Sequence, residues 1–202
     1  MEYPGKAIFE QQGYLKVKDV VSPELCKFLT HILLRKSETT TVPEDPQVPD
    51  CLTTMDHELV FETLLERIWP VLESCIGIEL LPTYAYARLY KNGNVLETHT
   101  DRPACEISIT VQLARSHHYS WPLYVNGSRF DLAEGDAVIY KGCNYFHWRD
   151  ACDGPPDYYS GQVFLHYVNA NGKYSSEYCD SSNRDVNNRL FVKYRNFLME
   201  DK

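Results

Sequence analysis

A histidine and a carboxylate, His99 and Asp101, are separated by one residue in the run Glu97-Thr-His-Thr-Asp-Arg-Pro103. On an extended strand this spacing directs both side chains to the same face. His147, in Tyr145-Phe-His-Trp-Arg149, is the candidate for a third ligand from further along the chain. Two histidines and one carboxylate on one face of a metal ion leave three adjacent coordination positions open, which suits Fe(II). The sequence therefore predicts a metal site in which His99, Asp101 and His147 are both the ligands and the catalytic residues.

The composition is that of an ordinary globular protein, because 44% of the 202 residues are hydrophobic and 24% are charged. This length suits a single domain spanning residues 1–202. Aromatic residues make up 13% of the chain, which favours strands. The net charge of −8 and the pI near 5.3 argue against nucleic acid or an anionic membrane as a partner, since both bind basic surfaces.

The seven cysteines are an odd number and include no Cys-x-x-Cys pair, which indicates reduced thiols rather than a disulfide framework. The first ten residues contain no apolar leader segment. No run approaches the roughly 18 apolar residues needed to span a membrane. We therefore expect a cytoplasmic protein.

The N-terminal part, residues 1–81, is expected to be mainly helical and to pack on the segment that follows. Apolar residues at helical spacing predict helices over residues 23–36 and 57–76. Residues 37–55 contain three prolines and are interpreted as a long, solvated loop. A short strand is expected at residues 13–18.

After Pro82 the pattern changes to short alternating segments and tight turns. These segments predict several antiparallel strands and a hairpin at Asn126-Gly127. Helices followed by at least six such strands are typical of a mainly β fold with flanking helices, a double-stranded β-helix or jelly-roll barrel. Residues 82–169 would be this barrel with the metal site. Residues 170–202 would be a C-terminal extension, with a closing strand or short helix at residues 190–198.

Several features of the barrel region occur together in one known family. They are Tyr90 before a glycine-containing turn, His99-x-Asp101, the polar strand 108–112, Gly135-Asp136 before the distal His147, and the final strand 162–168. With them, the region from Tyr84 to Asn169 resembles the core of the Fe(II)- and 2-oxoglutarate-dependent dioxygenases. Within that family it is most similar to the prolyl 4-hydroxylase-like branch.

The resemblance implies that Fe(II) and the co-substrate 2-oxoglutarate bind at this site, with ascorbate as a further candidate cofactor. Together with O2 they would hydroxylate a small-molecule or peptide substrate and release succinate and CO2. Relatives that halogenate lack the carboxylate at the position of Asp101, so its presence favours hydroxylation. The substrate would be of amino-acid type: a prolyl or other side chain of a protein, or a free small metabolite.

One feature departs from the family. Its members place a Lys or Arg about ten residues after the distal histidine, where it binds the far carboxylate of 2-oxoglutarate. Residues 150–172 contain no Lys or Arg. The first candidate for this role is Arg88, which lies on the same strand face as Tyr90. The second is Arg149, which is two residues after His147 and therefore points to the same face of a strand. An ion pair at the barrel rim is the alternative role for Arg88. By resemblance, Tyr90 and Gln112 match positions that contact 2-oxoglutarate.

Two other functions are compatible with the sequence. A cupin-type metal-dependent enzyme that does not use 2-oxoglutarate would explain the missing basic residue, although the close His-x-His pair of such enzymes is absent. The other alternative is a non-catalytic jelly-roll module used for binding, against which the complete set of metal ligands argues.

If Arg88 and Arg149 both face the pocket, one could hold 2-oxoglutarate and the other a substrate carboxylate, which would favour a small acid.

Overall fold

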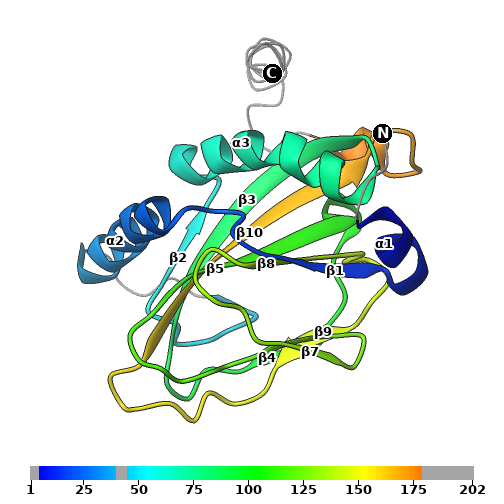
Figure 1. Cartoon of the computed structure of the whole chain (residues 1–202). Helices are drawn as coiled ribbons and strands as arrows, with labels where there is room; N and C mark the ends of the chain where they lie inside the picture. The colour runs from blue at the N-terminus through cyan, green and yellow to red at the C-terminus, as the bar shows by residue number, and fades with distance from the viewer. Residues whose placement is uncertain (1–4, 40–44, 179–202) are drawn as a thin grey trace.

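Two antiparallel sheets enclose the interior of a barrel in the computed structural model, which describes residues 5–39 and 45–178 (Figure 1). The large sheet has the order β1 (Tyr14–Val17), β8 (Ala137–Tyr140), β5 (Ile107–Arg115), β10 (Tyr159–Asn169), β3 (Leu80–Lys91) and β2 (Thr53–Asp56). The small sheet has the order β4 (Leu96–His99), β9 (His147–Arg149), β6 (Leu123–Val125) and β7 (Ser128–Phe130). This arrangement confirms the predicted mainly β fold, a double-stranded β-helix.

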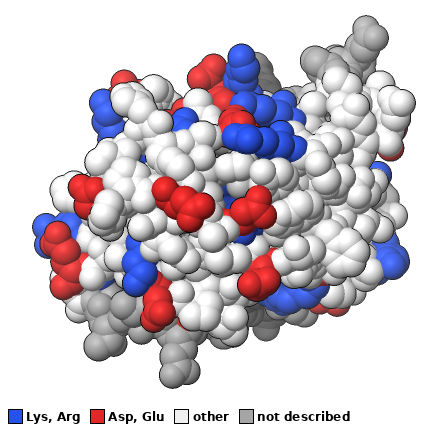
Figure 2. All heavy atoms as spheres, turned by 90° about the horizontal axis from the view of Figure 1, so that it is seen from below, with Lys and Arg blue, Asp and Glu red and all other residues white. Residues whose placement is uncertain are grey.

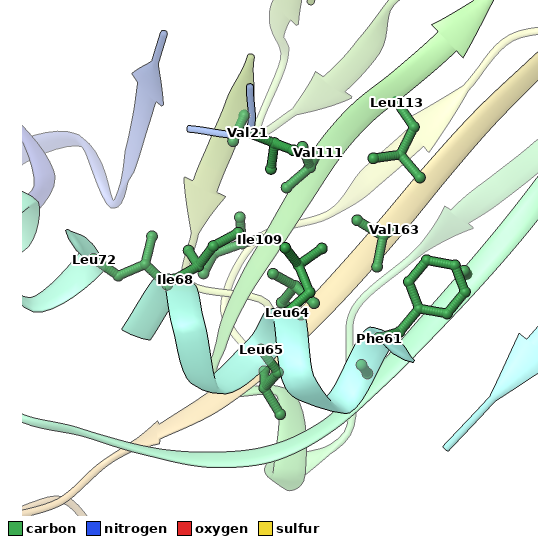
Figure 3. Packing of buried hydrophobic residues seen from close by; sticks show 14 of the residues in the cluster. Val21, Phe61, Leu64, Leu65, Ile68, Leu72, Ile109, Val111, Leu113 and Val163 are labelled. Carbon is green, nitrogen blue, oxygen red and sulfur yellow. The ribbon is translucent and has the colours of Figure 1, made fainter. Parts of the chain in front are cut away.

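Three helices accompany the sheets: α1 (Lys6–Gln12), α2 (Pro23–Thr39) and α3 (Leu59–Ile76). Figure 3 shows the apolar stripe of α3 packed against outward-facing residues of the large sheet, including Ile109, Val111 and Val163. The stripe consists of Phe61, Leu64, Leu65, Ile68 and Leu72, all buried. At its end, Gly77 takes the left-handed conformation with φ of 65°, as expected for a helix C-cap. The helices therefore close the outer face of the large sheet, and the small sheet lies on the opposite side.

The element boundaries differ from expectation mainly before residue 60. The first predicted helix continues to Thr39, and the second begins at Leu59. The expected loop over residues 37–55 was wrong at both ends, because residues 37–39 belong to α2 and residues 53–55 belong to β2. The short helix α1 was not predicted. The strand or helix expected at residues 190–198 lies outside the described residues.

Strand β5 shows how the barrel interior becomes polar. Seven of its residues, from Ile107 to Leu113, are buried because helices cover one face and the small sheet the other. Ile109 and Val111 belong to the apolar core beneath the helices. The alternate residues Ser108 and Thr110 are buried polar side chains. Such groups need hydrogen-bond partners, so the interior is organised by polar contacts rather than by packing alone.

Two short helical turns complete the described chain, η1 (Pro103–Cys105) and η2 (Ser175–Glu177). Across the described residues, none of the helices combines the length and apolar character that crossing a membrane requires. Lys and Arg side chains are interspersed with Asp and Glu side chains on the face seen in Figure 2.

Candidate metal centre and cavity

His99 and His147 face each other on paired strands of the small sheet. His99 is the last residue of β4, His147 is the first of β9, and the two are register partners in the antiparallel pair. Their ring centroids are 4.1 Å apart. Strand pairing therefore brings together the two histidines that the sequence predicted as ligands.

Asp101 lies beyond the end of β4, so the expectation that it continues the strand of His99 was wrong, although its carboxylate reaches the same site. Its backbone N–H donates a hydrogen bond to the carbonyl oxygen of Gly142 (2.9 Å), and its Oδ2 accepts one from the Ser108 hydroxyl (2.6 Å). Its Oδ1 lies 3.4 Å from Nε2 of His147 and 3.8 Å from Nε2 of His99. A backbone and a side-chain contact thus aim one carboxylate oxygen at both histidines.

Both histidines are held in the tautomer that a metal ligand requires. Nδ1 of His99 lies 2.8 Å from the carbonyl oxygen of Glu97, and Nδ1 of His147 lies 3.1 Å from the carbonyl oxygen of Tyr145. Because a carbonyl oxygen only accepts, both Nδ1 atoms carry the hydrogen, and each Nε2 lone pair is available to a metal. The ligand atoms of the three residues lie within 4.8 Å of one another. The donor set therefore fits a divalent ion such as Fe(II).

The charges of the site favour a cation. Burial opposes ionisation of Asp101, but His147, His166 and the Ser108 hydrogen bond outweigh it and lower the pKa of Asp101 to about 2. Burial and the neighbouring His147 lower the pKa of His99. Near neutral pH the site already holds a carboxylate and a neutral imidazole, so a metal need not displace protons from them.

A second cluster next to this site consists of Asp101, Cys105 and His166. The Ser108 hydroxyl lies between two of its members, 2.6 Å from Oδ2 of Asp101 and 3.0 Å from Nδ1 of His166. Burial strongly raises the pKa of the Cys105 thiol, whose sulfur lies 3.2 Å from the Tyr84 hydroxyl. Through Ser108, this cluster holds the carboxylate of Asp101 in place beside the three predicted ligands.

A cavity of about 340 Å³ borders the three predicted ligands. Its lining also includes Asp45, Tyr84, Arg88, Arg102, Tyr140 and His166. The guanidinium of Arg102 lies over the ring of Tyr84, 4.7 Å from its centroid. The cavity is thus walled by charged, aromatic and imidazole groups beside the metal ligands.

Arg88 faces the interior, as predicted, and its side chain is 3% exposed. Nε and Nη2 of Arg88 both lie 2.7 Å from Oδ2 of Asp45. Nη1 donates to the hydroxyl of Tyr90 (2.9 Å), and Nη2 also donates to Oε1 of Gln47 (3.1 Å). The expected ion pair exists, but it is buried inside the barrel rather than exposed at the rim.

Arg149 also faces inward and is only 1% exposed. Nη1 donates to the carbonyl oxygen of Trp121 (2.5 Å) and Nη2 to Oε1 of Gln162 (2.8 Å). Its Nε is buried without a hydrogen-bond partner, and within residues 5–39 and 45–178 no carboxylate pairs with it. Burial lowers the pKa of this guanidinium. A buried cation without an anionic partner is costly in a folded protein.

The two remaining predicted residues lie near these arginines. The Tyr90 hydroxyl is the acceptor from Arg88 just described, and Tyr90 is fully buried. Nε2 of Gln112 donates to Oγ of Ser160 (2.9 Å), and Oε1 of Gln112 accepts from Gln162 (3.2 Å). Gln112 therefore lies in a chain of polar side chains that leads to Arg149.

Sequence reasoning missed Asp45 and Tyr140. Asp45 lies in a segment interpreted as a solvated loop, and its partner Arg88 is 43 residues away. Tyr140 is the last residue of β8, and its ring centroid lies 4.8 Å from that of His147.

Comparison with known proteins identifies the fold. No protein-family model and no curated protein sequence matches the chain. Among solved structures, a prolyl-4-hydroxylase from Pseudomonas putida is similar with a TM-score of 0.59 and 13% identity over 79% of this chain and 95% of that one. EctD from S. alaskensis with bound Fe is similar with a TM-score of 0.60 and 18% identity over 81% of this chain and 75% of that one.

HygX from Streptomyces hygroscopicus, a structure with nickel and 2-oxoglutarate bound, gives a TM-score of 0.59 and 13% identity over 82% of this chain and 86% of that one. These likenesses confirm the expected fold. The fold is therefore that of structures solved with iron and with 2-oxoglutarate, and the residues of this chain decide what it can bind.

Proposed function

We propose that this chain is an Fe(II)- and 2-oxoglutarate-dependent oxygenase that hydroxylates an amino-acid-type substrate, either a prolyl or other side chain of a protein or a free small metabolite. The observation that carries the proposal is the convergence of His99 Nε2 and His147 Nε2 on Oδ1 of Asp101 at the wall of a cavity. Two imidazoles and one carboxylate are the ligand set that leaves three positions for co-substrate and O2. The fold shared with such enzymes agrees with this proposal.

Bound Fe(II) would supply the chemistry by which 2-oxoglutarate and O2 become succinate and CO2 while one oxygen atom enters a C–H bond of the substrate. The protein's part is to hold the ligands and shape the cavity. The carbonyl oxygens of Glu97 and Tyr145 fix the histidine tautomers, and Ser108 fixes Asp101. Each contact positions a ligand before the metal arrives, which lowers the cost of organising the site.

For the far carboxylate of 2-oxoglutarate we propose Arg149. Its guanidinium is buried, has no acidic partner among the described residues, and keeps an unpaired Nε. Leu96, its register partner across β4 and β9, lines the cavity, so Arg149 lies on the strand next to the cavity wall. An incoming carboxylate would supply the missing negative charge.

Arg88 is the weaker candidate because the carboxylate of Asp45 already occupies two of its nitrogens. Gln112 would act through Gln162, which it holds against Arg149. Tyr90 would act through its hydrogen bond with Arg88. In this arrangement a single guanidinium on β9 replaces the basic residue that the family usually places after the distal histidine.

The experiment that tests the proposal is succinate formation under air with Fe(II), ascorbate and 2-oxoglutarate. Wild type is compared with His99→Ala and with His31→Ala, a matched control on the exposed face of α2. We expect turnover in wild type and in the control and none in His99→Ala. The proposal fails if wild type binds Fe(II) but 2-oxoglutarate neither changes the visible absorption of the metal nor yields succinate, and a cupin-type enzyme would then be favoured. Failure to bind Fe(II) at all would favour the non-catalytic module.

A further inference from the structure

His166, near the C-terminal end of β10, lies in the cavity wall beside the metal ligands but is not one of the three predicted ligands. Its Nδ1 lies 3.0 Å from Oγ of Ser108, and the same oxygen lies 2.6 Å from Oδ2 of Asp101. Ser108 has one hydroxyl hydrogen to give. The ionised carboxylate is the strongest acceptor in reach and the closer one, so the hydrogen goes to Asp101.

This assignment determines which ring nitrogen of His166 carries the hydrogen. Because the Ser108 hydroxyl gives its hydrogen to Asp101, its oxygen accepts from Nδ1–H of His166. The neutral ring then has its lone pair on Nε2. Among the described residues, no group makes a hydrogen bond with Nε2 of His166. Nε2 is nevertheless not one of the fully buried side-chain atoms that lack a partner, so part of its surface is accessible. The lone pair is therefore accessible from the cavity that His166 lines.

The neighbours of His166 add a cation to the same wall. The ring of Tyr84 lies against that of His166, with centroids 4.6 Å apart, and Arg102 lies over the ring of Tyr84. All three residues line the cavity. A guanidinium has five N–H donors in a fork that matches a carboxylate, so Arg102 can bind a ligand while it stays on Tyr84. The wall thus offers an acceptor and a cation a short distance apart.

We propose that His166, Tyr84 and Arg102 form the substrate-recognition wall, and that the substrate is a free amino acid, whose N–H donates to Nε2 of His166 and whose carboxylate binds Arg102. This inference rests on the proposed function and narrows its substrate class. A cavity of about 340 Å³, shared with the co-substrate, suits a molecule of that size. A peptide-bound residue lacks the carboxylate that Arg102 would bind.

The test measures succinate formation with each of the 20 L-amino acids, their N-acetyl forms and their amides as probes. We expect at least one free amino acid to raise turnover above the level without substrate. Its N-acetyl form and its amide should each be poorer by about tenfold or more in kcat/KM. Acetylation replaces the charged ammonium donor with a neutral amide N–H that carries a bulky acyl group, and amidation removes the negative charge that Arg102 would bind.

Two variants assign the contacts. His166→Asn keeps an amide N–H near the position of Nδ1 for Ser108 but removes the Nε2 acceptor, so it should lose most discrimination against the N-acetyl form and retain that against the amide. Arg102→Gln should lose most discrimination against the amide and retain that against the N-acetyl form. His31→Asn, on the exposed face of α2, is the control and should keep both.

The inference is overturned if the blocked forms serve as well as the free amino acid, if a prolyl peptide is accepted and free amino acids are not, or if both variants keep the discrimination of wild type. The visible absorption of the Fe(II)–2-oxoglutarate complex is followed in parallel. If wild type does not form that complex, the proposed function itself fails and this inference fails with it, which is a separate result.

Discussion

Arg88 holds Asp45 inside the barrel, with Nε and Nη2 each 2.7 Å from the same carboxylate oxygen, Oδ2. Asp45 also accepts from the Tyr86 hydroxyl (2.8 Å) and, through Oδ1, from the backbone N–H groups of Gln47 and Val48. A buried charge stripped of its partner is strongly destabilising. The pair therefore fastens the segment after residue 44 to β3.

The first prediction concerns this pair. Asp45→Asn and Arg88→Met should each lower the free energy of unfolding by about 3–5 kcal/mol, and the double variant by less than the sum of the two. Urea unfolding at pH 7 measures the effect. Glu10→Gln, which breaks the exposed pair between Lys6 and Glu10 at 3.8 Å, is the control and should change stability by less than about 1 kcal/mol. Equal effects for Asp45→Asn and the control would contradict the prediction.

The second prediction concerns Gly142, whose carbonyl oxygen anchors the backbone of Asp101. A Cβ atom at this position would overlap Oδ2 of Asp101, Oγ of Ser108 and the carbonyl oxygen of Cys105. Gly142→Ala should therefore displace the carboxylate and weaken Fe(II) binding by about 10–100-fold.

Gly161→Ala is the matched control for Gly142→Ala. A Cβ there would meet only ordinary contacts, the nearest being Cδ1 of Leu33 at 3.5 Å. Isothermal titration of the two apoproteins with Fe(II) under anaerobic conditions compares them. Wild-type affinity in Gly142→Ala would show that Asp101 is not held as the geometry indicates.

Much of this site could be predicted because it depends on local pattern. The alternation of Ser108 and Thr110 with Ile109 and Val111 marked a strand with a polar inner face, and such alternation fixes side-chain direction. His99 and His147 were identified from their residue types and spacing, without any knowledge of the strands that pair them.

The rest depends on contacts that the local sequence does not encode. Strands β4 and β9 have only four and three residues, too few for a periodic signal, and exist because they pair with each other. Asp45 reaches Arg88 from a segment rich in proline. The role of Gly142 follows from the close approach of two loops rather than from its own neighbours in sequence.

The third prediction separates the two interior arginines. Arg149→Met should raise the Kd for 2-oxoglutarate by about 100-fold or more, because a charge-assisted contact with the far carboxylate is lost. It should cost little stability, since removing an unpaired buried charge offsets the loss of the hydrogen bonds to Trp121 and Gln162. Arg88→Met should change the Kd for 2-oxoglutarate little but lower the stability. Titration of 2-oxoglutarate into the Fe(II) protein compares the Kd values of the two variants. A larger effect of Arg88→Met on the Kd would transfer the anchoring role to Arg88.

The last prediction concerns the pH dependence of stability. Burial, opposed in part by Asp101, lowers the pKa of His166 from its ordinary 6.5 to about 4 in the folded protein. Between these two values the unfolded chain binds more protons at this position than the folded one, so the free energy of unfolding increases with pH. The contribution is fully present above pH 6.5 and is lost as the pH falls towards 4. A shift of this size corresponds to roughly 3 kcal/mol.

His166→Asn removes the titrating group, so its stability should fall less steeply than that of wild type between pH 6.5 and 4. Urea unfolding of the metal-free proteins at half-unit pH steps measures both slopes. His31→Asn, from the exposed face of α2, should keep the slope of wild type. Parallel curves for wild type and His166→Asn would mean that His166 binds a proton in the folded protein as readily as in the unfolded chain. The lone pair assigned to Nε2 would then be protonated at neutral or mildly acidic pH, and the wall would present a donor where an acceptor is proposed.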